Sequence, residues 1–166
     1  TGQTTAIANG LAVGTYYIQL TDINLCTATA SATLIDPPAL SVTVNVTSDY
    51  NGEDITCDGA SDGQATAMPA GGTGVYTYEW FEDAALTLST GITTQVANGL
   101  RARDYWVRVL DVNGCEIVGT VTLTAPPILT AVASVSSNYN GADISCNGAS
   151  DGSATVIPGG GTGTYT

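Results

Sequence analysis

Alternating apolar and polar residues mark a series of short segments along the chain. In residues 41–47, Val42, Val44 and Val46 alternate with polar residues, as in a strand with one buried face. No window shows a helical period of 3.6 residues, so the pattern predicts an all-β chain. The further predicted strands are 55–57, 64–69, 76–81, 93–97, 105–110 and 117–124.

Turn-forming residues separate these predicted strands. Asn51-Gly52 is the dipeptide most typical of a tight hairpin. Residues 58–63 are predicted to form a turn in which Gly59 and Gly63 have positive φ and Asp62 caps the backbone locally. Two more turns are predicted, at Asn98-Gly99 and at 111–114.

One phrase of the sequence occurs twice. ITCDGASDG at 55–63 returns as ISCNGASDG at 144–152, an offset of 144 − 55 = 89 residues, and the same offset aligns the rest of the chain without a gap. Self-similarity at a fixed period is the signature of a tandem array. We therefore predict three parts: 1–38, the C-terminal part of one repeat; 39–127, a complete repeat; and 128–166, the N-terminal part of the next.

The period indicates what each repeat is. A unit of about 89 residues is long for a solenoid repeat and suits a small autonomous domain. Seven short strands with turns between them predict tandem immunoglobulin-like antiparallel β-sandwich domains, with Trp80 near the core centre. Pro126-Pro127 is predicted to be a stiff linker between consecutive domains, which gives an extended string.

Charge and composition exclude several functions. The net charge is −12, with 15 acidic residues and only three basic ones, so binding to nucleic acid is excluded and anionic membranes would repel the chain. Without His or Lys, Ser and Cys lack a conventional activating base, and we predict that the chain is not an enzyme. Glu79 and Glu82 are a candidate acid–base pair, but they follow no recognised pattern.

Two cysteines occur in each repeat, which predicts disulfides in an extracellular setting. A bond between Cys57 and Cys115 would close about 58 residues and contribute about 4 kcal/mol. Immunoglobulin topology, however, places these two turns at opposite ends of a sandwich. In that case Cys57 would bond with the equivalent of Cys115 in the next repeat. The bond within one repeat is the preferred prediction, and the partners of Cys26 and Cys146 are expected outside this sequence in either case.

The acidic turns are candidate calcium sites because hard oxygen ligands suit Ca²⁺. Loops of adjacent domains that meet at the Pro-Pro linker could share such an ion. Asp, Asn and Gly are also the residues that turns require, and this second explanation is preferred. No other cofactor is expected. The candidate calcium ligands are Asp58, Asp62, Asp111 and Asn113.

Three motifs together resemble the SprB-type repeat of very large cell-surface adhesins of Bacteroidota. They are CDGASDG at 57–63, GGTGVYTYEW at 71–80 and DVNGC at 111–115, and the resemblance extends over the whole chain. It implies type IX secretion, display on the cell surface and a filament that an envelope motility machinery moves through other parts of the protein. The sequence departs from the motif in the added Tyr-Asn-Gly at 50–52 and in Leu25, which replaces the glycine at 114, so a differently shaped turn is expected there.

The expected function is that of a stalk segment in an adhesin that takes part in surface attachment and gliding motility. Its expected partners are the neighbouring repeats. The alternative is a multivalent module whose repeats each bind polysaccharide or an abiotic surface weakly. Such a module could use an aromatic platform made from Tyr76, Tyr78, Trp80, Tyr105 and Trp106, although these residues are expected mainly to fill the core and pair across strands.

Overall fold

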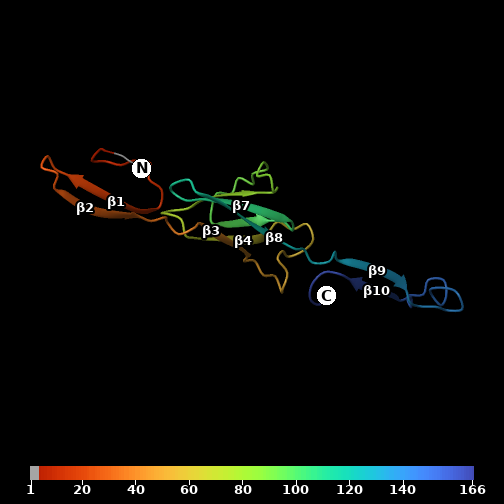
Figure 1. Ribbon diagram of the computed structural model, residues 1–166. Helices are drawn as coiled ribbons and strands as arrows, with labels where there is room; N and C mark the ends of the chain where they lie inside the picture. The colour runs from red at the N-terminus through yellow and green to blue at the C-terminus, as the bar shows by residue number, and fades with distance from the viewer. Residues whose placement is uncertain (1–3) are drawn as a thin grey trace.

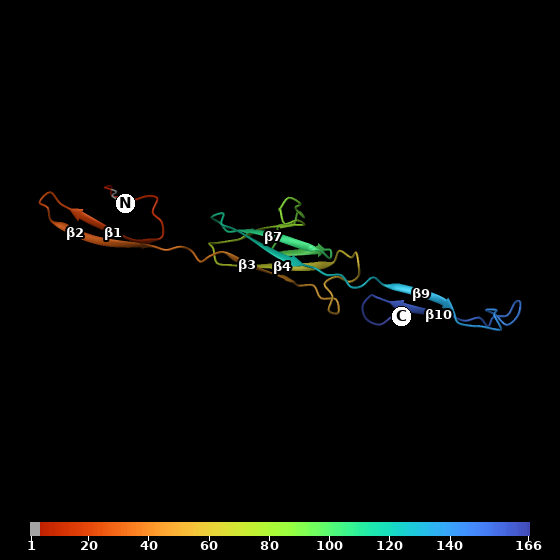
Figure 2. The same cartoon turned by 45° about the vertical axis from the view of Figure 1, so that its right-hand side comes forward.

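The computed structural model describes residues 4–166, so the first three residues of the predicted fragment 1–38 lie outside the described part. The described chain is all-β, as predicted, and contains no helix that could cross a membrane. Figures 1 and 2 show three parts in a row: a first hairpin, a central sandwich and a last hairpin. The strands are β1 (Gly14–Thr21), β2 (Thr27–Leu34), β3 (Ser41–Val46), β4 (Gly63–Ala70), β5 (Thr77–Phe81), β6 (Val96–Leu100), β7 (Asp104–Leu110), β8 (Glu116–Thr122), β9 (Thr130–Val135) and β10 (Ala154–Gly159).

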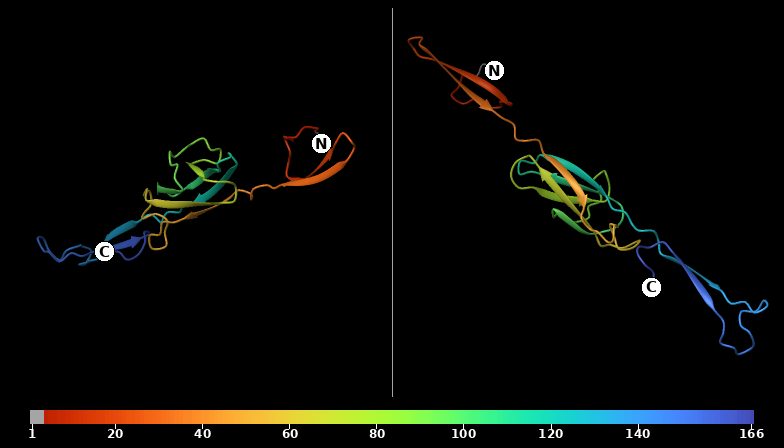
Figure 3. Two further views of the ribbon diagram at one scale, coloured as in Figure 1. Left: turned by 90° about the vertical axis from the view of Figure 1, so that its left-hand side faces the viewer. Right: turned by 90° about the horizontal axis from the view of Figure 1, so that it is seen from below.

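The central sandwich consists of two antiparallel three-stranded sheets. One sheet has the order β3-β4-β6 and the other the order β5-β7-β8. This order is compatible with an immunoglobulin-like arrangement. The antiparallel sandwich predicted for the complete repeat is confirmed, and Figure 3 shows its two layers from two further directions.

The core follows from the alternation of apolar residues. Ala65 and Ala67 of β4 and Val107 and Val109 of β7 are all buried and belong to one core cluster. Trp80 is also buried at the centre, as predicted, and its indole Nε1 donates a hydrogen bond of 2.9 Å to the carbonyl oxygen of Thr94. The core thus combines small alanine side chains from one sheet with a large indole from the other.

One glycine lets the two sheets approach each other where β3 and β8 adjoin. A Cβ atom on Gly119 of β8 would lie 2.5 Å from Cγ2 of Val44 and 2.9 Å from Cγ1 of Val42. Its backbone is not in the left-handed region, so the requirement for glycine here is one of space rather than of φ. Gly119 thus sets the sheet spacing along this edge.

The strand count differs from the prediction. The segment 55–57 forms no strand; Ile55 instead lies in the loop between β3 and β4, with its side chain fully buried in the core. The sandwich therefore has six strands rather than seven. The predicted turn at Asn98-Gly99 is also wrong, because both residues lie inside β6, where Gly99 (φ 73°) is the extra residue of a bulge opposite β4.

The two flanking hairpins repeat parts of the sandwich. β1-β2 has the register of β7-β8, and β9-β10 has that of β3-β4. The differently shaped turn expected at Leu25 does not occur. Leu25 adopts φ 69°, close to the 79° of Gly114, and its N–H donates to the Asp22 carbonyl as that of Gly114 does to Asp111. The turn therefore keeps the shape that it has at Gly114, with Leu25 in a left-handed backbone conformation that is strained for a residue other than glycine.

Candidate functional site at the junctions between repeats

The glycine-rich loop after β4 holds the linker that enters the repeat. Gly71, Gly72 and Gly74 have φ of 76°, 62° and 73°, left-handed values that glycine adopts without a steric cost. The backbone N–H of Gly72 donates a hydrogen bond of 2.7 Å to the carbonyl oxygen of Pro38. A Cβ atom on Gly71 would lie only 2.0 Å from the carbonyl oxygen of Ala39, so the loop fits directly against the linker.

The same arrangement recurs at the next junction. The N–H of Gly161 donates a hydrogen bond of 2.7 Å to the carbonyl oxygen of Pro127, and a Cβ atom on Gly160 would lie 1.9 Å from the Ile128 oxygen. In both repeats a tyrosine hydroxyl also donates a hydrogen bond to a glycine carbonyl of this loop. The hydroxyl of Tyr165 donates to the Gly160 carbonyl at 2.6 Å, as that of Tyr76 does to Gly71. Each Pro-Pro linker is therefore fastened to the repeat that it enters.

Asp111 connects this loop to the turn between β7 and β8. Its Oδ1 accepts hydrogen bonds of 2.9 Å from the N–H groups of Asn113 and Cys115, and its Oδ2 accepts bonds of 3.0 Å from the N–H and the hydroxyl of Thr73. Desolvation raises the pKa of Asp111, but these hydrogen bonds from Cys115, Thr73 and Asn113 outweigh it and hold the pKa below its ordinary 3.8. The ionised carboxylate therefore joins the turn to the loop.

The chain leaves the repeat after β8, at what we call the exit end of the sandwich; the loop between β3 and β4, residues 47–62, lies there and is called the exit loop. Two aspartates other than Asp111 organise this loop. Asp62 accepts hydrogen bonds from the N–H (3.2 Å) and the hydroxyl (2.6 Å) of Thr56, which confirms its predicted capping role. Asp54 Oδ2 accepts two bonds of 2.7 Å from Thr124, in the segment that leads out of the repeat. The loop is thereby tied to the departing chain.

Tight turns shape this exit loop as the sequence predicts, with one exception. Asn51 and Gly52 have φ of 59° and 92°, and Tyr50 and Glu53 exchange backbone hydrogen bonds around them. Gly59 has the predicted positive φ of 81°, but Gly63 does not. Gly63 is needed for space, because a Cβ atom there would lie 2.4 Å from Cδ2 of Leu123.

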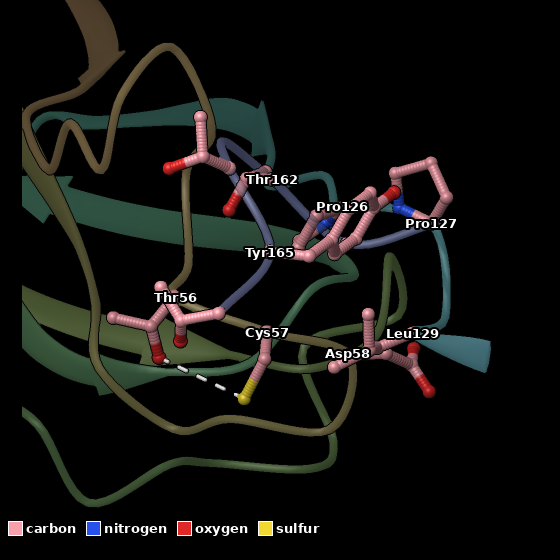
Figure 4. A pocket seen from close by; sticks show the side chains of 11 residues that line it. Thr56, Cys57, Asp58, Pro126, Pro127, Leu129, Thr162 and Tyr165 are labelled. Atoms are coloured by element: carbon pink, nitrogen blue, oxygen red, sulfur yellow. Dashed lines mark hydrogen bonds between the residues drawn. The ribbon is translucent and has the colours of Figure 1, made fainter. Parts of the chain in front are cut away.

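A cleft of about 320 Å³ lies between the exit end of the complete repeat and the next repeat. Thr56, Cys57 and Asp58 line one wall, and Gly161 and Thr162 of the following glycine-rich loop line another. Figure 4 shows Pro126, Pro127 and Tyr165 at the same cleft. The cleft is therefore built from the linker and from both repeats.

The predicted calcium ligands fall into two groups at opposite ends of the sandwich. Asp58 and Asp62 belong to the exit loop, whereas Asp111 and Asn113 belong to the turn at the entry end. The carboxylates of Asp62 and Asp111 accept protein hydrogen bonds. Within residues 4–166, no group of three or more His, Cys, Asp or Glu side chains is arranged to hold a metal ion. Calcium shared between adjacent repeats stays a prediction.

All four cysteines are free and exposed. Cys57 lies in the exit loop, on the side where Asp104 of β7 pairs with Thr122, and Cys115 follows the other end of β7, where Leu110 pairs with Glu116. β7 spans about 20 Å, whereas the Cα atoms of a disulfide lie within about 7 Å of each other. This arrangement does not support the preferred bond within one repeat. The carboxylate of Asp111, with some desolvation, raises the pKa of the Cys115 thiol above 9.0.

The remaining candidate residues have structural contacts. Glu79 pairs with Arg108 and Glu82 pairs with Arg103, so each carboxylate of the candidate acid–base pair faces a guanidinium. Trp80 and Tyr105 are buried. The other three aromatic residues of the candidate platform are partly buried: Tyr76, Tyr78 and Trp106.

The family described as SprB repeat matches residues 50–84 and 138–166. Both segments start at or beside a Tyr-Asn-Gly turn and include the exit loop and the strand after it, so they occupy corresponding places in successive repeats. No curated protein and no solved structure matches the chain. These two segments are thus similar to the SprB repeat, and the similarity suggests a repeat region of a surface adhesin.

The turns of this site are predictable from the sequence, whereas the contacts that they make across the junction are not. The hydrogen bond from Gly72 to Pro38 joins residues far apart in sequence, and no local pattern signals it. The recurrence of Pro-Pro and Gly-Gly-Thr-Gly at one period was the available signal, since both motifs occur in each repeat.

Proposed function

We propose that this chain is a segment of the stalk of a large extracellular adhesin, and that its function is to provide length and stiffness. The match to the SprB repeat supports a repeat region of a surface adhesin. The observation that carries the stalk role is the linker contact made at both junctions, from Gly72 to Pro38 and from Gly161 to Pro127.

The physical basis of this role lies in how the linker is restrained. Proline fixes its own φ, which already removes much of the freedom of a linker. The carbonyl of the second proline is hydrogen-bonded to the following repeat, so the linker and that repeat move together. Bending between successive repeats is then confined to the short stretch around Ala125, between the exit of β8 and the first proline.

The acidic surface supports the same role. A net charge of −12 over 166 residues makes neighbouring repeats repel each other at low ionic strength. Repulsion between successive repeats favours an extended chain over a folded-back one, and repulsion between filaments favours solubility. Salt would weaken this contribution, whereas the hydrogen-bonded linkers would persist.

Surface display, type IX secretion and a role in gliding motility belong to this proposal through the resemblance to SprB-type adhesins. In that setting the repeats would extend from the cell, and other parts of the protein would engage the motility machinery in the envelope. The alternative, in which each repeat binds a polysaccharide or an abiotic surface, is less supported. Trp80 and Tyr105 are buried in the core rather than displayed.

Removing whole repeats from the adhesin tests the stalk role. Deletions in steps of one period keep each Pro-Pro linker matched to a glycine-rich loop. The stalk proposal predicts that filament length in electron micrographs falls by a constant step per repeat, while attachment per distal tip is unchanged. Attachment that declines in proportion to the number of repeats would instead support the multivalent module.

A further inference from the structure

The two cysteines of each repeat occupy the two ends that meet at a junction. Cys57 lies in the exit loop and lines the cleft beside Pro126 and Pro127. Cys115 closes the turn at the entry end, where its N–H donates to Asp111. Both thiols are exposed and free, so neither is committed to the core of its own repeat.

The far wall of the cleft shows what the next repeat brings to Cys57. Thr162 of that wall corresponds to Thr73, one period earlier. Thr73 is bonded to the turn that carries Cys115: its N–H and hydroxyl donate to Asp111, its hydroxyl accepts from Asn113, and its carbonyl accepts from Val112. In a complete following repeat, the turn that corresponds to residues 111–115 would therefore be hydrogen-bonded to Thr162, and its cysteine would lie at the cleft that Cys57 lines.

We propose that Cys57 forms a disulfide with the cysteine that corresponds to Cys115 in the following repeat. That cysteine falls at position 115 + 89 = 204, beyond this sequence. By the same rule, Cys115 forms a disulfide with the cysteine that corresponds to Cys57 in the exit loop of the preceding repeat. Every junction would then have two covalent connections, the Pro-Pro linker and the disulfide.

The chemistry is the oxidation of two thiols. The sulfur atoms of the two cysteines join, and the thiols release two protons and two electrons. A disulfide-bonded acceptor, such as an oxidised thiol–disulfide oxidoreductase, takes up the two protons and the two electrons and becomes a dithiol. Because the two connections are separate, the bond limits bending and twisting at a junction that the linker alone would leave mobile around Ala125.

This inference rests on the proposed function only in that complete repeats follow one another in one chain. It predicts a covalent bond, whereas the stalk proposal predicts how length and attachment depend on repeat number. A junction without a disulfide would leave the deletion experiment unaffected. Loss of attachment in that experiment would likewise leave the disulfide map unaffected.

The test uses the whole chain continued after Thr166 with a second copy of residues 78–127, which completes the following repeat. Under the proposal, Cys26, Cys115 and Cys146 have partners that this chain does not include. Cys26→Ser and Cys146→Ser remove two of them, and Cys115 is kept as the competing partner for Cys57. Cys26 and Cys146 are exposed, so serine is expected to leave the fold intact. The protein is folded and incubated with oxidised glutathione, and the remaining thiols are alkylated.

Trypsin then distinguishes the possible bonds without reduction. The chain has no Lys, so cleavage occurs only at Arg101, Arg103, Arg108 and their added copies. We expect fragment 1–101, which carries Cys57, to be linked to the C-terminal fragment with the added cysteine, and Cys115 to be alkylated. A bond from fragment 1–101 to the fragment with Cys115, or alkylation of Cys57, would overturn the proposal.

Matched variants keep the result interpretable. Cys57→Ser should abolish the linked fragment, whereas Cys115→Ser should leave it unchanged. Far-UV circular dichroism establishes whether the added repeat is folded. Should it not fold, residues 1–127 followed by a complete copy of 39–127 provide a second chain, in which the same bond from Cys57 is expected and its absence counts against the proposal.

Discussion

The backbone N–H of Gly72 donates a hydrogen bond of 2.7 Å to the carbonyl oxygen of Pro38. This contact joins a loop inside the repeat to the linker before it, and Gly161 and Pro127 make the same contact one repeat later. The glycines that make it possible are therefore needed for assembly of the string as well as for the turn.

Substitution of Gly71 tests how closely the loop approaches the linker. Gly71→Ala adds a Cβ atom 2.0 Å from the Ala39 oxygen in a left-handed backbone, and we expect a loss of about 3 kcal/mol of unfolding free energy. Gly91→Ala is the matched control, because Gly91 has φ 78° but open space around it, and it should cost only about 1 kcal/mol. Urea unfolding followed by tryptophan fluorescence reports the sandwich alone, since both Trp residues lie in it. Equal losses would show that the linker does not pack there.

The lowered pKa of Asp111 predicts an acid limit to the stability of the repeat. A carboxylate whose pKa is lower in the folded state stabilises the fold above its unfolded pKa, and this contribution disappears as the pH falls through the folded value. Stability should therefore be flat near neutral pH and decline once the pH drops below about 4. In Asp111→Asn this decline should be shallower and the melting temperature at pH 7 several degrees lower.

Asp83 is the control for this pH dependence, because its pKa is also lowered, mainly by a hydrogen bond from the Leu88 N–H. Asp83→Asn should remove a separate part of the acid decline without affecting the linker contact. Thermal melts at a series of pH values give both profiles. An Asp111→Asn variant with the pH profile of the parent chain would contradict the role assigned to this carboxylate.

Gly119 is predicted to set the spacing between the sheets. Gly119→Ala should cost about 1–3 kcal/mol by overpacking against Val44. In a Val44→Ala background the same substitution should cost about 1 kcal/mol less, because the clashing methyl groups are absent. A double-mutant cycle in urea measures this coupling, and additive losses would show that the two residues do not compete for space.

The strained turn at Leu25 predicts the cost of changing its counterpart. Gly114 has φ 79° with open space around its Cα, so Gly114→Leu should cost about 1–2 kcal/mol from backbone strain alone. Gly114→Asn should cost less, since asparagine tolerates this conformation better. Chemical unfolding compares the two variants, and a leucine variant as stable as the parent would mean that the turn changes shape.

The fold was largely predictable because its signals are local. Alternating valines indicated β3, and the YTYEWF segment with Trp80 indicated β5 in the core. The error at 55–57 arose because a short apolar segment looks the same whether it pairs as a strand or inserts one side chain. Ile55 does the latter, and its side chain is buried beside Gly63 and Leu123. Leu123 is distant in sequence, and a single glycine such as Gly63 does not by itself indicate a close contact.

The site was less predictable because its contacts cross between elements. Asn98-Gly99 is a strong turn signal, but here Gly99 supplies the left-handed residue of a bulge in β6, which the same dipeptide also suits. Asp111 and Asp62 were assigned both to turns and to calcium. The hydrogen bonds of Asp111 to Thr73 show a third use, in which one carboxylate connects two loops.

Amide hydrogen exchange of Gly72, measured by NMR on the folded chain, tests the central claim most directly. If the loop holds the linker, the Gly72 amide should exchange at least about tenfold more slowly than in an unfolded peptide, because exchange then requires the bond to Pro38 to open. Exchange of this amide at the unfolded rate, while the amides of β4 and β7 stay protected, would show that the linker is free and that the repeats form a flexible chain.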